Sequence, residues 1–265
     1  MASTTKSHLT LVCLIAIGVA MHVPIVVPGR WDAVIYGACL LIAVGLGLRW
    51  AIHTALLMGL LAAISLTPAL RDSIGGMPVL PLLIPLLVSS LIAAAWSSTR
   101  QTLGWMRRGQ VDANMWALIG LTGVVSAAAL IAWAVWTDNL GIGERMIAGA
   151  AQIPLVALVF LGIPIFAFLN AITEEAIFRG VLLTALMESS KSPWLAIMVQ
   201  ASAFAALHYE MGFPNGLIGY AMVFSYGLVL GYLRRRTGGL MAPIVAHILA
   251  DLVIGYILLF TQVKA

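Results

Sequence analysis

The sequence predicts an all-α, polytopic membrane protein with about eight or nine transmembrane helices around an intramembrane cavity. Of its 265 residues, 62% are hydrophobic and only 9% are charged, and the mean hydropathy is +1.05. A soluble globular domain has about 25% charged residues. A chain with so little charge could not cover its own surface in water, so we expect lipid to be its main solvent.

Nine apolar segments follow one another, and a helical crossing needs roughly 20 apolar residues. They lie near residues 9–27, 33–48, 51–69, 79–97, 113–136, 148–188, 194–209, 215–233 and 239–262. The sixth is too long for one straight crossing, because about 40 helical residues measure roughly 60 Å against a hydrocarbon core of about 30 Å. We expect Pro154 and Pro164 to break it, with its first part along the interface or forming a partial span.

No stretch is polar enough to form a separate soluble domain, so the chain is interpreted as one membrane domain. Within it, residues 1–140 are predicted to supply N-terminal transmembrane helices without an assigned role, and residues 141–265 to form the functional core. The first apolar run follows Lys6 and is interpreted as an uncleaved span, because further spans follow at once. Two cysteines are too few for a disulfide framework.

The basic residues lie in short loops, which explains the net charge of +4 by membrane topology and argues against a nucleic-acid partner. With a cytoplasmic N-terminus, four basic residues fall outside, namely Arg30, Arg71, Arg145 and Lys264. Nine fall inside, namely Lys6, Arg49, Arg100, Arg107, Arg108, Lys191, Arg234, Arg235 and Arg236. The positive-inside rule therefore predicts a cytoplasmic N-terminus in a multi-pass protein, which we expect in a bacterial inner membrane.

Ionisable residues at membrane depth are the informative exceptions, since each costs about 2.5–3.5 kcal/mol at the bilayer centre. In the first cluster, Glu175 and Arg179 are four residues apart and can pair on one helix face. Glu174 points elsewhere and has no cation at helical spacing, while Asn170 lies one turn earlier on its face. Glu174 is therefore the predicted general base, with Glu175 and Arg179 as its support.

Two further clusters follow in later segments. Gln200, Phe204 and His208 form one stripe at steps of four, and His247 and Asp251 share a helix face. Counted from the predicted cytoplasmic ends at about 1.5 Å per residue, all three clusters lie roughly 15–21 Å deep. A lone intramembrane histidine is more often a packing partner, but clusters at matching depth predict a shared, partly wet cavity.

These clusters resemble the CAAX protease and bacteriocin-processing family of intramembrane proteases, also called the Abi family. The resemblance rests on three motifs, Glu174-Glu175-x-x-x-Arg179-Gly180, Phe204-x-x-x-His208 and His247-x-x-x-Asp251. The resemblance covers about residues 165–255, and the first 140 residues match nothing specific.

The resemblance implies a glutamate-type endopeptidase that cleaves a membrane-associated protein or peptide, such as a prenylated tail, a bacteriocin precursor or a sorting tail. Glu174 would activate a water, His208 would hold or deprotonate it, and His247 with Asp251 would flank the oxyanion. Many members have asparagine at the Asp251 position. An ionised aspartate cannot donate a hydrogen bond, so Asp251 is either protonated or only orients His247. Phe204, Asn170 and Gln200 are predicted to contact substrate.

Three alternatives remain open. Two histidines and a glutamate could ligate zinc, but His-Glu-x-x-His is missing and the acidic pair stands next to Arg179, so no metal or other cofactor is predicted. A non-catalytic immunity or binding protein could use the same fold, although the polar set is complete. A proton-coupled carrier would also need intramembrane acids, but no inverted repeat is found. Oligomeric state is not predicted.

Overall fold

The computed structural model describes residues 2–27, 29–67, 69, 79–137 and 154–262. Within these residues every regular element is helical, which confirms the all-α prediction. Residues 148–153 of the sixth apolar segment, the predicted boundary at residues 140–141, and Arg71, Arg145 and Lys264 lie outside the described residues.

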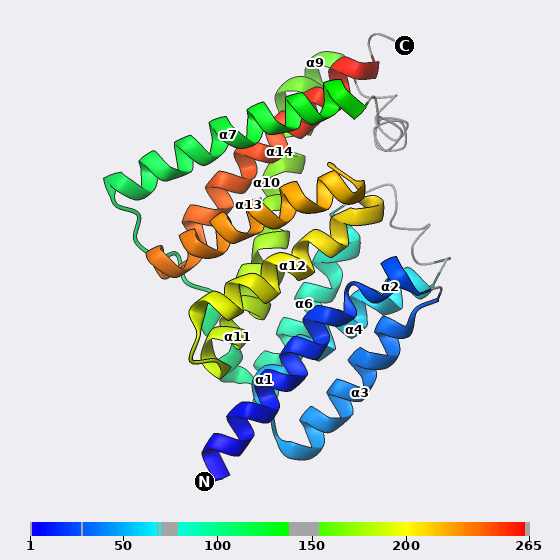
Figure 1. Ribbon diagram of the computed structural model, residues 1–265, viewed down its shortest axis with the longest axis vertical. Coiled ribbons are helices and arrows are strands. Elements are labelled where there is room, and N and C mark those ends of the chain that lie inside the picture. Colours follow the sequence, from blue (N-terminus) through cyan, green and yellow to red (C-terminus); the bar gives the residue numbers. More distant parts are fainter. Residues whose placement is uncertain (1, 28, 68, 70–78, 138–153, 263–265) are drawn as a thin grey trace.

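The helices follow the predicted apolar segments closely. They are α1 (Ala2–Ala20), α2 (Val23–Val26), α3 (Trp31–Leu46), α4 (Arg49–Leu66), α6 (Leu80–Ala95), the 3₁₀ helix η1 (Arg100–Trp105), α7 (Ala113–Thr137), α9 (Leu155–Ala157), the π-helix η2 (Leu158–Gly162), α10 (Ile163–Glu175), the π-helix η3 (Ala176–Leu182), α11 (Leu183–Ser189), α12 (Pro193–Met211), α13 (Gly216–Thr237) and α14 (Met241–Gln262). Figure 1 shows α1, α3 and α4 at one end, α7 and α14 at the other, and α12 with α13 between them.

Among the described residues, five helical stretches are long and apolar enough to cross a membrane. They are Arg49–Leu66, Ala113–Thr137, Leu155–Ser189, Gly216–Thr237 and Met241–Leu259. Three shorter apolar helices accompany them, Thr5–Ala20, Trp31–Leu46 and Leu80–Ala95. These helices indicate a multi-pass integral membrane protein, and the number of crossings stays a prediction.

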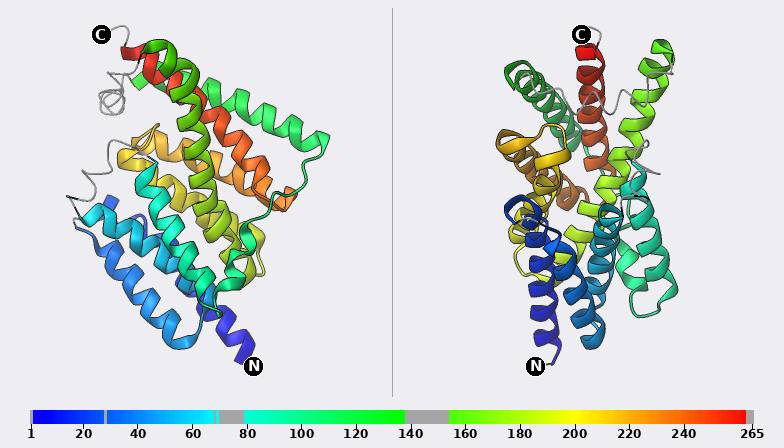
Figure 2. Two further views of the ribbon diagram at one scale, coloured as in Figure 1. Left: turned by 180° about the vertical axis from the view of Figure 1, so that it is seen from behind. Right: turned by 90° about the vertical axis from the view of Figure 1, so that its right-hand side faces the viewer.

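Of the two breaks expected in the sixth segment, the one at Pro164 is wrong. Pro154 caps the helix start, but Pro164 lies inside a helical stretch that runs unbroken from Leu155 to Ser189. The π-helical turn η2 comes directly before the turn containing Pro164 and changes the hydrogen-bond register where a proline N–H is missing. At a rise of about 1.5 Å per residue, the length of this stretch exceeds the thickness of the hydrocarbon core of a bilayer. Figure 2 shows it passing along the molecule from the α14 end toward the N-terminal helices.

Helices α12 and α13 pack closely because two glycines of α13 face α12. A Cβ added to Gly227 would stand 3.0 Å from Cβ of Ala201, and one added to Gly231 would stand 2.9 Å from Nε2 of Gln200. The spacing of small residues thus serves contacts within the chain, as their four-residue repeat suggests. Close backbones also let the Gln200 amide donate to the carbonyl of Gly227 at 2.9 Å.

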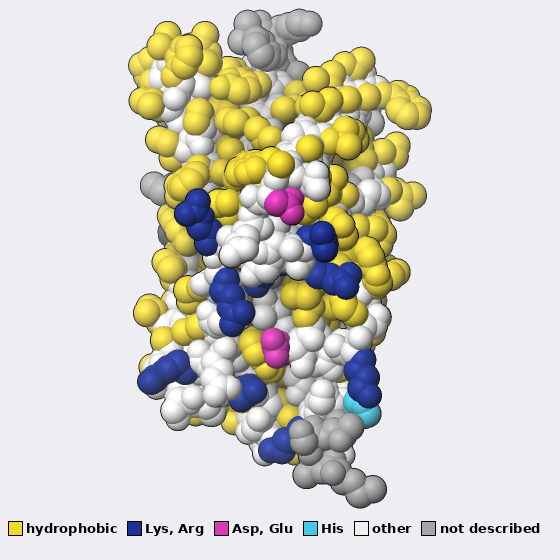
Figure 3. Space-filling view, turned by 90° about the vertical axis from the view of Figure 1, so that its left-hand side faces the viewer, with side chains coloured by type: hydrophobic (Ala, Val, Ile, Leu, Met, Phe, Trp, Pro, Cys, Tyr) yellow, Lys and Arg dark blue, Asp and Glu magenta, His cyan; other side chains and the backbone are white. Residues whose placement is uncertain are grey.

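The exterior is apolar over wide areas, as a surface in contact with lipid must be. Large side chains such as Leu41, Val135 and Trp136 are 76%, 80% and 82% exposed. Lys and Arg side chains gather on one face, shown in Figure 3, where α11 and α13 end. We call this the basic face; that it is cytoplasmic stays a prediction.

Replacing Gly231 by leucine should destabilise the protein, because the new side chain would collide with Gln200 and Ile197 of α12. Overpacking of this kind costs about 1–3 kcal/mol, measured as a lower thermal unfolding midpoint in detergent micelles. Gly120→Leu is the matched control, since Gly120 is exposed and nothing lies within 4 Å of an added Cβ. Equal midpoints for the two variants would contradict the close packing of α12 on α13.

Candidate active site

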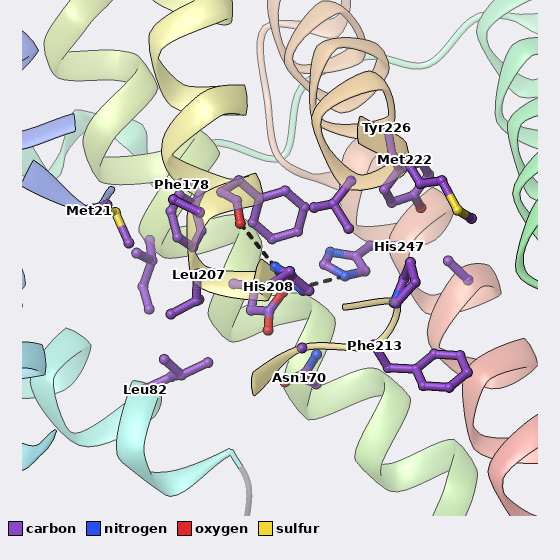
Figure 4. Close-up of a pocket in the computed structure, with 18 of the residues that line it drawn as sticks. Met21, Leu82, Asn170, Phe178, Leu207, His208, Phe213, Met222, Tyr226 and His247 are labelled. Atoms are coloured by element: carbon purple, nitrogen blue, oxygen red, sulfur yellow. Dashed lines mark hydrogen bonds and ion pairs between the residues drawn. The ribbon is translucent and has the colours of Figure 1, made fainter. Parts of the chain in front are cut away.

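A large cavity of about 1550 Å³ lies among the helices, and residues of all three predicted polar clusters line it. Glu174, Asn170, His208, His247 and Asp251 all line it. They come from α10, α12 and α14, which are far apart in sequence. Figure 4 shows the imidazoles of His208 and His247 at the centre of this cavity, with Asn170 nearby.

The two adjacent glutamates have different surroundings. Glu174 lines the cavity, and its Oε2 is buried without a hydrogen-bond partner among the described residues. Glu175 is fully buried, and is absent from the described residues that line the cavity. Consecutive helical residues point about 100° apart, which explains why only one carboxylate faces the cavity.

Glu175 binds two positively charged or chargeable groups at once. Its Oε1 accepts a hydrogen bond from Nη1 of Arg179 at 2.8 Å and another from Nδ1 of His247 at 2.8 Å. Arg179 is itself fully buried, so the ion pair neutralises a charge that would otherwise be very costly in the interior. The pair lies where α10 passes into the π-helical turn η3, a kind of turn that occurs often at functional sites.

The orientation of His247 follows from this contact. Because a carboxylate only accepts, Nδ1 carries the hydrogen and Nε2 points the other way. Nε2 lies 3.6 Å from Oε2 of Glu174 and 3.6 Å from Oδ1 of Asp251. Both distances are too long for direct hydrogen bonds and suit groups that act on a shared third atom.

Asp251 is held in place by Asn170. The Asn170 amide donates to Oδ2 of Asp251 at 3.1 Å, which leaves Oδ1 turned toward His247. Asn170, which was predicted as a substrate contact, lines the cavity. Its bond to Asp251 also links α10 to α14. Asp251 is within reach of His247, as their four-residue spacing predicted.

Phe204 is the common packing surface of the site. Its ring centroid lies 4.6 Å from that of His208 and 5.9 Å from that of His247. The guanidinium carbon of Arg179 stands 4.3 Å from the same centroid, a cation–π contact. Phe204 lines the cavity, so a role in substrate contact remains a prediction, while its contacts give it a positioning role.

Within the described part of the chain, one ring nitrogen of His208, Nε2, makes no hydrogen bond. Its Nδ1 donates to the carbonyl of Phe204 at 2.9 Å, since a carbonyl oxygen can only accept. In the neutral ring Nε2 is then an acceptor that could take a proton from, or orient, a water molecule.

Gln200 does not share the cavity with the residues above, although substrate contact was predicted for it. It is fully buried, and its Nε2 donates to the carbonyls of Ile197 and Gly227 at 3.0 and 2.9 Å. It is absent from the cavity wall within the described part of the chain. Gln200 lies on the same helix as His208, as predicted, but its amide donates to a carbonyl of α13 instead of reaching the cavity.

Tyr226 is a site residue that the motifs do not include. Its ring stands edge-on to His247 with centroids 6.0 Å apart, and its hydroxyl donates to the carbonyl of Ala246 at 2.9 Å. It also lines the cavity, and Figure 4 shows it beside Met222. A hydroxyl inside the apolar segment 215–233 was the available signal, but spacing alone does not tell which helix face meets the site.

Comparison with known proteins finds a family model that is similar to the part of the chain that carries the site. Residues 156–253 match the model described as type II CAAX prenyl endopeptidase Rce1-like. This match confirms the resemblance to the CAAX protease family. This Rce1-like region contains Glu174, His208, His247 and Asp251, which line the cavity.

One relative is an uncharacterised 24.3 kDa protein of Escherichia coli, 34% identical over 97 residues. The match covers 36% of this chain and 42% of that relative, so the similarity spans less than half of either protein. No solved structure matches the chain.

Removing one partner of the buried ion pair should be strongly destabilising. We expect Arg179→Met to lower the free energy of unfolding by about 3–5 kcal/mol, because it leaves a buried carboxylate without its cation. The double variant Glu175→Gln/Arg179→Met should regain part of this loss, since no unpaired charge remains. Unfolding in detergent micelles measures both, and a double variant less stable than Arg179→Met would contradict the pairing.

Proposed function

We propose that the protein is an intramembrane endopeptidase of the CAAX-protease type. It would hydrolyse a peptide bond in a membrane-associated protein or peptide with a water activated by Glu174. The observation that carries this proposal is that Glu174, His208, His247 and Asp251 line one cavity while Glu175 and Arg179 lie behind them. The similarity of residues 156–253 to an endopeptidase family supports the same reaction.

In the proposed reaction, Glu174 takes a proton from water as the water oxygen attacks the carbonyl carbon of the scissile bond. Nε2 of His208 accepts a hydrogen bond from the same water and orients it. The carbonyl oxygen becomes an oxyanion in the tetrahedral intermediate, and Nε2 of His247, when protonated, donates to it. Glu174 then passes its proton to the leaving nitrogen as the carbon–nitrogen bond breaks, which gives one new carboxyl and one new amino terminus.

Glu174 is assigned as the base rather than Glu175 because the two carboxylates have unequal access and unequal pairing. Both hydrogen bonds to Oε1 of Glu175 come from groups that must stay in place, Arg179 and His247. Oε2 of Glu174 has no such bond among the described residues, and Glu174, unlike Glu175, is among the described residues that line the cavity. A general base must reach the proton that it removes, so access decides the assignment.

The reaction is proposed to proceed without a metal or other cofactor. Within the described residues no group of three or more His, Cys, Asp and Glu side chains is arranged as metal ligands. The protein is proposed to act as a multi-pass protein of a bacterial inner membrane with a cytoplasmic N-terminus. Its substrate class includes prenylated tails, bacteriocin precursors and sorting tails.

Glu174→Gln should abolish cleavage without unfolding the protein, because an amide cannot accept the proton from water. The expected loss in kcat is about 10²–10⁴-fold. The matched control is Glu188→Gln, since Glu188 is exposed near the end of the same helical stretch. Membrane proteomics should find the same uncut protein in cells that lack the gene and in cells with Glu174→Gln. Full processing in the Glu174→Gln cells would exclude the proposed reaction.

Asp251→Asn tests whether the site needs hydrogen bonding or a negative charge at this position. If the residue donates to the oxyanion or orients its neighbours through hydrogen bonds, Asp251→Asn should keep cleavage within about 10-fold, a loss below about 1.4 kcal/mol. Asp251→Leu should lose far more, because it leaves Asn170 and His247 without this partner. Cleavage rates of both variants provide the measurement, and equal losses would show that the negative charge itself is needed.

A further inference from the structure

The cavity has a second polar region outside the Rce1-like region. Arg30, Asp32 and Tyr36, from the start of α3, line the same cavity as Glu174. Arg30 donates through Nε to Oδ1 of Asp32 at 2.9 Å and through Nη2 to Oδ2 at 2.7 Å. Asp32 is only 3% exposed, so this two-bond contact fixes the guanidinium in the wall.

Arg30 keeps hydrogen-bonding capacity after this contact. A guanidinium has five N–H donors, and the described residues accept from its Nε and Nη2 alone. The side chain of Arg30 remains 30% exposed, whereas that of Asp32 is 4% exposed. The hydrogen bonds from Arg30 to Asp32 raise the pKa of the guanidinium above its ordinary value, so it stays charged.

The position of Arg30 is opposite the basic face. Helices α1, α4 and α12 begin near Lys6, Arg49 and Lys191, and their far ends supply cavity-lining residues. These residues are Met21, Ile64, Ser65, Gly212, Phe213 and Pro214. Of the described residues that line the cavity, Arg30 is the one Lys or Arg.

Volume and lining both suit an extended peptide chain. The cavity of about 1550 Å³ exceeds the 300–1,000 Å³ or so of ordinary small-molecule pockets. Besides the two polar regions, much of the cavity wall is apolar, with Met58, Ile177 and Leu207 among the lining residues. A ligand that reaches both regions needs apolar side chains and an anionic group at one end.

We propose that Arg30, held by Asp32, binds the C-terminal carboxylate of a peptide substrate whose scissile bond lies at Glu174. Arginine suits this ligand because its planar N–H groups match the geometry of a carboxylate. This inference rests on the proposed function and assigns to the N-terminal helices a part in selecting the substrate. Arg30 is thus a specificity determinant, and the substrate enters from the end of the cavity opposite the basic face.

The test measures binding in the full-length Glu174→Gln protein, so that it does not depend on hydrolysis. The protein is reconstituted in phosphatidylcholine vesicles, and the probes are labelled apolar hexapeptides with either a free C-terminal carboxylate or a C-terminal amide. The carboxylate peptides should bind about 10-fold more tightly, equivalent to about 1.4 kcal/mol. Adding Arg30→Gln should remove this preference, and Arg30→Lys should keep part of it. Arg49→Gln, at an exposed arginine that is absent from the described cavity wall, should leave this preference unchanged.

Equal binding of the two peptide forms to the parent protein, or a preference that survives Arg30→Gln, would overturn the proposal. So would the loss of copurified phosphatidylglycerol in Arg30→Gln with an unchanged peptide preference, since Arg30 would then bind a lipid phosphate. If Arg30→Gln fails to fold, the parent protein and Arg30→Lys still test the proposal. A carboxylate site predicts that Arg30→Lys prefers carboxylate over amide peptides less strongly than the parent protein does. Absence of cleavage by the native protein overturns the proposed function alone, because the binding preference is measured separately.

Discussion

The buried carboxylate of Glu175 organises the centre of this protein. Its Oε1 joins Arg179 on its own helical stretch to His247 on α14, with both contacts at 2.8 Å. In a low-dielectric interior such bonds are strong, and the loss of any partner leaves an unpaired buried charge that destabilises the folded state. The ring of His247 is therefore fixed, and its Nε2 is aimed at Glu174 and Asp251. The adjacent residue Glu174 is left free to face the cavity because its neighbour takes up the cation.

Phe204 adds a second constraint, from packing rather than charge. Its ring contacts the imidazoles of His208 and His247, and the guanidinium of Arg179 lies over it at 4.3 Å. Phe178 packs edge-on to it with centroids 5.0 Å apart. An aromatic ring at this point sets distances between helices without offering a hydrogen bond that would compete with the polar groups. The spacing of Phe204 and His208 along α12 is thus a requirement of site geometry.

The cavity joins two parts of the chain with different roles. Residues 156–253 contain the proposed catalytic groups and match the model of an endopeptidase family. Helices before residue 137 supply part of the cavity wall, including Tyr36, Met58 and Leu82. One hydrophobic core includes Leu14, Met58, Phe178 and Phe204, so the two parts pack as a unit. Variation in the N-terminal helices would therefore change which substrates fit without changing the proposed catalytic groups.

Composition and spacing were enough to predict an all-helical membrane protein, the Glu175–Arg179 pair and the separate position of Glu174, because helix geometry relates neighbours three and four residues apart. They did not reveal that Pro164 stays within a helix, that Gln200 bonds α13, or that Tyr226 borders His247. Arg30 was counted only as a loop charge, and its place in the cavity wall depends on how α3 packs. The sequence by itself determined the chemical groups and their order along each helix. Only the tertiary structure decided which faces meet, because contacts between distant helices depend on packing and crossing that local periodicity does not encode.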